Sequence, residues 1–216
     1  QIIKNVQANR TLVLDYNQAV LNGVQWNMDK DVPLFDKDNS ISFKHVEEDV
    51  IDFNYQRTIP HKFSQNDPGI AISDVDGNGT DDVVIGASAN YPTTLIKQKI
   101  DGSFFKPSTI GDVHKPQDDA GLLLFDADND GDLDLYIASG GSPYSRSHLS
   151  CMHRFYSNDG KGQFKLKEDA IPKIYSVSSC VRACDFDADG DLDLFVGGRI
   201  TEKGYPLPGE SHVLKN

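Results

Sequence analysis

The chain has 216 residues, of which 38% are apolar and 9% aromatic, and no apolar run approaches the roughly 18 residues that a membrane span needs. This composition is typical of a folded globular protein and excludes a disordered one. Its 33 acidic and 21 basic residues give a formal net charge of −12, which disfavours binding to nucleic acid or to an anionic membrane face.

The first part of the chain carries no repeat. It begins at Gln1 without an initiator Met or a signal-like apolar segment, so we expect a piece of a longer polypeptide. Within residues 1–30, the alternating stretch Thr11–Asp15 predicts a single strand. Further on, Phe43–Val46 and Val50–Phe53 are predicted to be strands that lead into the repeated region.

Three nine-residue segments hold 4, 5 and 5 aspartates and no Lys or Arg: loop one (Asp74–Asp82), loop two (Asp126–Asp134) and loop three (Asp185–Asp193). The residues outside these loops are close to neutral in sum, so the negative charge is local. Carboxylates crowded in this way repel one another unless a cation offsets them. In every loop, oxygen-bearing side chains occupy positions 1, 3, 5 and 9, and glycine occupies position 6.

The flanks of the loops repeat as well. Apolar residues alternate on both sides, which predicts a strand, an acidic loop and a second strand. A further hairpin follows in the first two copies, with turns at Asp101-Gly102 and at Asn158–Gly162. We expect strands at Leu95–Ile100 and Phe104-Phe105 around the first of these turns. Four strands in each period of 52 or 59 residues (126 − 74 and 185 − 126) indicate a β-propeller blade.

The same hairpin in the second copy is predicted to pair Arg154–Ser157 with Phe164–Leu166. The third copy reaches Asn216 at the point where the second copy begins its second turn, so about three blades of an incomplete propeller are expected.

Oxygen ligands at alternate positions of a tight loop suit Ca²⁺, which takes 6 to 8 oxygens, and three such loops predict three ions. Zinc and copper would require His or Cys, and the loops contain neither. An EF-hand is excluded because its Glu at position 12 would fall on Ile85, Ile137 and Val196, which lie in predicted strands. Ordinary solvated Asp-Gly turns are the alternative, and three loops in one register argue against it.

The pattern D-x-D-x-D-G-D-x-D-L, followed by a strand and Gly-Gly, resembles the FG-GAP or VCBS repeat of integrin α-type β-propellers. This resemblance implies an all-β fold in which residues 31–216 form a partial propeller. The side-chain ligands that it implies are Asp74, Asp76, Asn78 and Asp82; Asp126, Asp128, Asp130 and Asp134; and Asp185, Asp187, Asp189 and Asp193. The backbone carbonyls that it implies as ligands belong to Thr80, Asp132 and Asp191.

Other motifs resemble Bacteroidetes cell-envelope proteins with ASPIC/UnbV domains, which are relatives of the cartilage acidic protein family. These motifs are Ile59–Gln65, Pro68–Asp76, Gly198-Arg199 and Tyr205–Pro208. The resemblance implies that residues 1–30 are the tail of a preceding UnbV-like domain or a linker. It also implies export to the periplasmic or extracellular face of the cell envelope.

The motifs leave two functions open. The first is a non-catalytic, calcium-binding adhesion module that binds a protein or glycan at the cell surface. The alternative is an accessory or catalytic domain of a carbohydrate-active enzyme. The six histidines form no spaced ligand set, and there is no G-x-S-x-G elbow or phosphate-binding glycine loop, which favours the first function.

Two finer predictions concern single residues. Loop one offers three carboxylates and one amide, whereas the other loops offer four carboxylates at the same positions, so loop one is predicted to bind calcium most weakly. Cys180 and Cys184 are predicted to lie on one strand with Cα atoms about 13 Å apart. That separation prevents a disulfide between them, so any disulfide within the chain would involve Cys151.

Overall fold

The structure of the chain, a computed structural model, describes residues 35–47, 49–65, 68–140, 148–201 and 204–216. The chain divides into two compact units, Gln1–Asp38 and Asn39–Asn216. Of the first unit only residues 35–38 are described, and all of them are exposed. The strand predicted at Thr11–Asp15 and the domain predicted at residues 1–30 lie outside the described residues.

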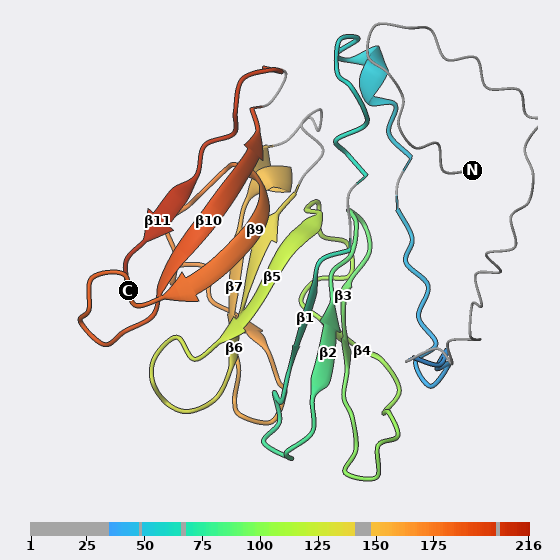
Figure 1. The fold of residues 1–216 in the computed structure, drawn as a ribbon, viewed down its shortest axis with the longest axis vertical. Helices are drawn as coiled ribbons and strands as arrows, with labels where there is room; N and C mark the ends of the chain where they lie inside the picture. The colour runs from blue at the N-terminus through green and yellow to red at the C-terminus, as the bar shows by residue number, and fades with distance from the viewer. Residues whose placement is uncertain (1–34, 48, 66–67, 141–147, 202–203) are drawn as a thin grey trace, which may run out of the picture. The chain divides into compact units, whose positions relative to one another are not determined.

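The second unit is built from three antiparallel sheets in which each strand pairs with its neighbour in sequence (Figure 1). The first sheet contains β1 (Ile70–Ser73), β2 (Asp82–Ile85), β3 (Thr93–Ile96) and β4 (Ser108–Ile110). The second contains β5 (Asp119–Phe125), β6 (Asp134–Ser139), β7 (Arg154–Ser157) and β8 (Lys165–Leu166). The third contains β9 (Val177–Cys184), β10 (Asp193–Ile200) and β11 (His212–Leu214).

This architecture confirms the predicted all-β fold with propeller-like blades, and the described residues do not form a closed ring. The second hairpin of the first sheet differs from the prediction. The strand after the Asp101-Gly102 turn contributes only one isolated bridge, Gln98 to Phe104, and β4 begins four residues later at Ser108. The predicted hairpin of the second sheet is confirmed by the pairing of β7 with β8.

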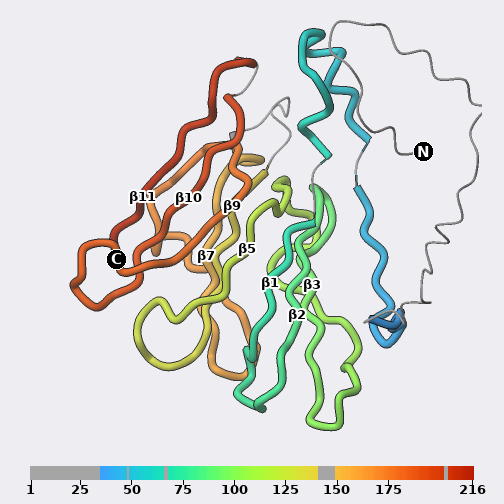
Figure 2. The backbone as a smooth tube through the Cα atoms, viewed as in Figure 1, coloured from blue at the N-terminus to red at the C-terminus, as the bar shows by residue number. Residues whose placement is uncertain are grey.

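Each acidic loop joins the first two strands of its sheet, and the three loops lie at the same end of the sheets (Figure 2). The ninth aspartate of each loop opens the second strand and pairs with the residue before the loop. The three pairs are Ser73 with Asp82, Phe125 with Asp134 and Cys184 with Asp193. The three loops therefore connect their two strands in the same register.

The core lies between neighbouring sheets and is divided into two clusters, one on each face of the second sheet. Leu135 belongs to the cluster shared with the first sheet, and Tyr136 belongs to the cluster shared with the third sheet. Both side chains are fully buried. Because β6 is covered on both faces, it reads as a continuous apolar run and not as an alternating one. Each large aliphatic side chain buried in this way contributes about 2 kcal/mol.

A buried charged cluster joins the first two sheets. The carboxylate of Asp119, at the start of β5, accepts hydrogen bonds from the Ala87 backbone N–H at 2.9 Å and the Thr93 hydroxyl at 2.7 Å, both in the first repeat. It also pairs with the guanidinium of Arg154 and with the ammonium of Lys115, whose Nζ lies at 3.2 Å. All three charged side chains are at most 5% exposed, so the pairing offsets the cost of burying them.

The segment 39–65 is not built as predicted. The strands expected at Phe43–Val46 and Val50–Phe53 are not formed, and a 3₁₀ turn, η2 (Asp52–Asn54), occupies part of the second. For the second segment, the reason is the fully buried Asp52 carboxylate, which accepts the backbone N–H groups of Phe63 and Ser64. A side chain that binds backbone donors in this way competes with strand pairing.

The motif Ile59–Gln65, which precedes the first sheet, lies close in space to the motifs around Arg199 and Tyr205 in the third repeat. The ring of Phe63 lies 5.9 Å from that of Tyr205, and the guanidinium of Arg199 lies over the Phe63 ring at 5.2 Å. The Gln56 amide donates to the Tyr205 carbonyl at 2.9 Å. The segment before the first sheet is therefore held against the third repeat.

The prediction that Cys180 and Cys184 lie on one strand is confirmed, because both belong to β9. Cys180 and Cys184 are free thiols. A second 3₁₀ turn, η3 (His148–Cys151), precedes β7. In the part of the chain that the structure describes, no helix has the length and hydropathy of a membrane span.

Candidate metal centres

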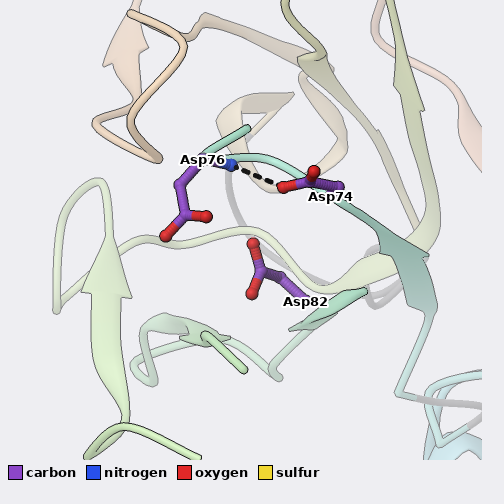
Figure 3. Close-up of side chains that lie close together, drawn as sticks. All are labelled: Asp74, Asp76 and Asp82. Carbon is purple, nitrogen blue, oxygen red and sulfur yellow. Dashed lines mark hydrogen bonds between the residues drawn. The ribbon is translucent and has the colours of Figure 1, made fainter. Parts of the chain in front are cut away.

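Each acidic loop gathers three carboxylates whose oxygen atoms lie within 4.8 Å of one another. In loop one these are the aspartates of positions 1, 3 and 9, which converge from the loop and from the start of β2 (Figure 3). Loop three uses the same positions, whereas loop two uses positions 1, 3 and 5. The groups are Asp74, Asp76 and Asp82; Asp126, Asp128 and Asp130; and Asp185, Asp187 and Asp193.

The backbone of the loops explains the glycine at position 6. Its φ angle is +85° in Gly79, +93° in Gly131 and +101° in Gly190, a region that favours glycine because a Cβ would be strained there. Position 4 is also left-handed, and it is occupied by Gly77, Asn129 and Ala188. Two left-handed residues in a short loop turn the chain around a common centre.

The first aspartate organises its loop by accepting backbone hydrogen bonds. Asp74 accepts the N–H groups of Gly77 at 2.8 Å and Gly79 at 2.7 Å. Asp126 and Asp185 accept the N–H of the glycine at position 6 in the same way. Burial acts to raise the pKa of Asp74, but these N–H donors outweigh it, so the net pKa is lowered and the carboxylate stays ionised.

The ninth aspartate of each loop accepts a hydrogen bond from a residue that follows the third strand of its sheet. Asp82 accepts the Val75 N–H within the loop and the Gln98 N–H from the residues after β3. Asp193 makes the same two bonds, with Phe186 and Asn216. Asp134 accepts the N–H of Asn158, which occupies the place of Gln98 in the second repeat. Burial raises the pKa of Asp82 and Asp134 despite these donors.

The fifth position differs between the loops. The Asn78 carbonyl oxygen accepts from Thr80, and its amide donates to the Gln98 carbonyl at 2.9 Å. Asp130 joins the carboxylate group of loop two. Asp189 lies outside the group of loop three and is paired with Lys215 at 3.4 Å, while its oxygen accepts the Asp191 N–H at 3.2 Å.

The side chains at the seventh position lie outside the three carboxylate groups and make other interactions. Partial burial and the neighbouring Asp130 carboxylate raise the pKa of Asp132 to about 6. The Asp191 carboxylate accepts the Asn129 amide at 2.7 Å, which joins loop three to loop two. The Thr80 hydroxyl donates to the Gln98 carbonyl at 3.0 Å.

The donor set fits a hard cation. Every side chain in the three groups offers carboxylate oxygen, the donor that calcium takes and that zinc and copper do not prefer. Among the described residues, buried oxygens of Asp76, Asp126 and Asp132 have no hydrogen-bond partner. A buried polar atom without a partner is costly, and a cation in the loop would satisfy it.

Comparison with protein families supports the FG-GAP-like repeat that was predicted from the sequence. Residues 74–137 match the FG-GAP-like repeat, a segment that begins at the first aspartate of loop one and ends within β6. Loop three lies outside the matched residues but shares the register and the carboxylate geometry of loop one. No curated protein matches the chain. The chain therefore contains an FG-GAP-like repeat within a propeller-like all-β fold.

Two features of the loops were not predicted from the sequence. The first is the hydrogen bond to the ninth aspartate from a residue that follows the third strand, made by Gln98, Asn158 and Asn216. The second is a lysine beside the carboxylates of loops one and three, Lys97 and Lys215. Both could be found by aligning the third strands of the repeats, because these residues occupy equivalent places at the ends of those strands.

Proposed function

We propose that this chain is a calcium-binding, non-catalytic module that binds a protein or glycan ligand at the cell surface. The observation that carries the proposal is the recurrence of one carboxylate group in three loops of a propeller-like fold. The FG-GAP-like repeat at residues 74–137 supports a module of the extracellular propeller type. In this proposal, the chain acts in the cell envelope as part of a longer polypeptide.

The role of calcium would be to hold the loops in their folded form. Without a cation, three carboxylates within 4.8 Å repel one another. With a cation, the loops would form a rigid surface at one end of the three sheets. A rigid surface is suited to ligand binding because little conformational entropy is lost on association.

Calcium stoichiometry tests the metal part of the proposal. We expect equilibrium dialysis with elemental analysis to give three ions per chain. Replacing the three aspartates of position 3 by asparagine (Asp76→Asn, Asp128→Asn and Asp187→Asn) removes one charge per loop and should reduce binding at every site. The matched control is Asp101→Asn, Asp159→Asn and Asp169→Asn, which changes the net charge equally and leaves the loops intact. A stoichiometry near zero in the folded wild-type protein would refute the metal sites.

A binding screen tests the functional part. We expect the chain to bind a protein or glycan in millimolar calcium and to lose that binding when calcium is chelated. The net charge of −12 argues against nucleic acid as the ligand. Calcium-dependent hydrolysis of a glycan would instead favour a carbohydrate-active enzyme.

A further inference from the structure

The register of the sheets identifies one equivalent residue in each repeat, at the end of the third strand. The strand residue that follows the ninth aspartate pairs with one residue of the third strand in each sheet: Val83 with Ile96, Leu135 with Tyr156 and Leu194 with Leu214. The next residue in the chain is therefore Lys97 in the first repeat, Ser157 in the second and Lys215 in the third. Lysine and serine differ by a full positive charge at this position.

Both lysines contact the carboxylates of their own loop. The Lys97 ammonium lies 3.1 Å from the Asp76 carboxylate at position 3. The Lys215 ammonium pairs with Asp187, the corresponding aspartate of loop three, and lies 3.4 Å from Asp189. An ammonium group held at a candidate ligand is a covalently attached counter-ion for that loop.

Loop two has no such cation among the described residues. Ser157 occupies the equivalent place, and no described lysine or arginine forms an ion pair with the carboxylates of this loop. Two of the buried carboxylate oxygens without a partner, in Asp126 and Asp132, belong to loop two. The negative charge of loop two is thus the least compensated of the three.

We propose that Lys97 and Lys215 are internal competitors for the metal and that loop two is consequently the site with the highest calcium affinity. The inference rests on the proposed function, because it ranks the same candidate sites. At loops one and three an incoming ion competes with the ammonium group for the carboxylate at position 3, whereas no described lysine or arginine forms an ion pair with the carboxylates of loop two. Calcium then occupies the loops in a fixed order, loop two before loops one and three.

Calcium titration followed by NMR tests this order, because the backbone amides of Gly79, Gly131 and Gly190 report on the three loops separately. In the wild-type chain, the Gly131 signal should respond at the lowest calcium concentration. Removing one charge beside a divalent ion changes its affinity by about tenfold. Lys97→Met should therefore strengthen loop one about tenfold, and Lys215→Met should strengthen loop three by a similar factor.

The reciprocal variant is Ser157→Lys, which should weaken loop two about tenfold. Lys99→Met is the matched control, because Lys99 lies two residues from Lys97 and contacts the Phe105 ring at 5.0 Å instead of a loop carboxylate. The contrary result is that the lysine variants fill their loops in the same order as the wild type, with less than about twofold change in calcium affinity at loops one and three. That result would overturn this inference and leave the proposed function intact. If no loop bound calcium in any variant, both would be overturned.

Discussion

At the scale of single residues, one loop position holds a residue that does not favour the backbone conformation it adopts. Position 4 is left-handed in all three loops, and it is glycine in loop one and asparagine in loop two. Both residues tolerate this region. In loop three it is Ala188, with φ of +61°. An alanine in the left-handed region is strained by its Cβ.

Replacing Ala188 by glycine should therefore stabilise the protein by up to about 1 kcal/mol. Gly190→Ala is the opposite change two residues later, where φ is +101°, and it should destabilise by about 1 kcal/mol or more. Both values can be measured by urea unfolding at saturating calcium. Equal destabilisation by the two variants would show that the left-handed conformation of Ala188 is not strained.

A second residue-scale feature is the buried His153. Burial lowers the pKa of this imidazole to about 4. Its Nδ1 lies 2.8 Å from the Tyr136 hydroxyl, and its Nε2 lies 3.2 Å from the Ser176 carbonyl. The ring is neutral in the folded state, whereas an unfolded histidine protonates near pH 6.5.

As pH falls from about 6.5 to about 4, the unfolded state binds a proton that the folded state does not, so stability falls. This difference amounts to about 3 kcal/mol at the acidic end of the range. His153→Gln should flatten the pH dependence of unfolding by about this amount. His114→Gln, at an exposed histidine, should leave the wild-type slope unchanged. Identical slopes for all three proteins would exclude His153 as the source.

At the scale of secondary-structure elements, the contact between the first two sheets depends on one buried anion. Asp119 is fully buried and binds Ala87 and Thr93 in the first repeat, while Lys115 and Arg154 supply the positive charge. Lys115 also donates to three backbone carbonyls, including that of Ala87 at 2.8 Å. Its burial lowers the pKa of the ammonium group, so the cluster depends on the carboxylate for compensation.

Asp119→Ala should destabilise the chain by about 3–5 kcal/mol, because it leaves two buried cations without their anion. Asp169→Ala, at an exposed aspartate, should change stability by less than about 0.5 kcal/mol. Chemical unfolding of both variants at saturating calcium measures the difference. A change below about 1 kcal/mol for Asp119→Ala would show that water replaces the carboxylate at little cost.

At the scale of the whole molecule, the proposed binding of a cation in each of the three loops would couple metal binding to the stability of the fold. A ligand present at one hundred times its dissociation constant adds about 2.7 kcal/mol per site. For a chain of this size, each kcal/mol shifts the melting temperature by about 2–4 °C. Loss of the metal should therefore be visible as a large thermal shift.

Chelation is expected to lower the melting temperature by at least about 5 °C. Re-added calcium should restore it more effectively than magnesium at equal concentration, because magnesium retains several of its waters and rarely uses a cage made only of protein. Differential scanning calorimetry with chelator, calcium or magnesium checks both statements. Identical melting in chelator and in millimolar calcium would identify the loops as ordinary solvated turns.

Local patterns in the sequence determined the architecture of the repeats. Alternating apolar residues predicted the strands around each loop, and the glycine at position 6 predicted the tight turn. Both features depend on neighbouring residues only, so they can be read without the fold. The local pattern at Val50–Phe53 gave a wrong prediction, because the partners of Asp52 are Phe63 and Ser64, which lie 11 and 12 residues further along the chain.

The tertiary structure alone decided which oxygens meet and which charges face them. The ligand pattern at positions 1, 3, 5 and 9 is common to the loops, yet the carboxylate groups of loops one and three use position 9 and that of loop two uses position 5. In loop three, Asp189 pairs with Lys215, which follows β11 and lies 22 residues after the ninth aspartate. Because electrostatic interactions depend on distance in space and not on separation in sequence, strand register had to place each lysine before its effect on a loop could be recognised.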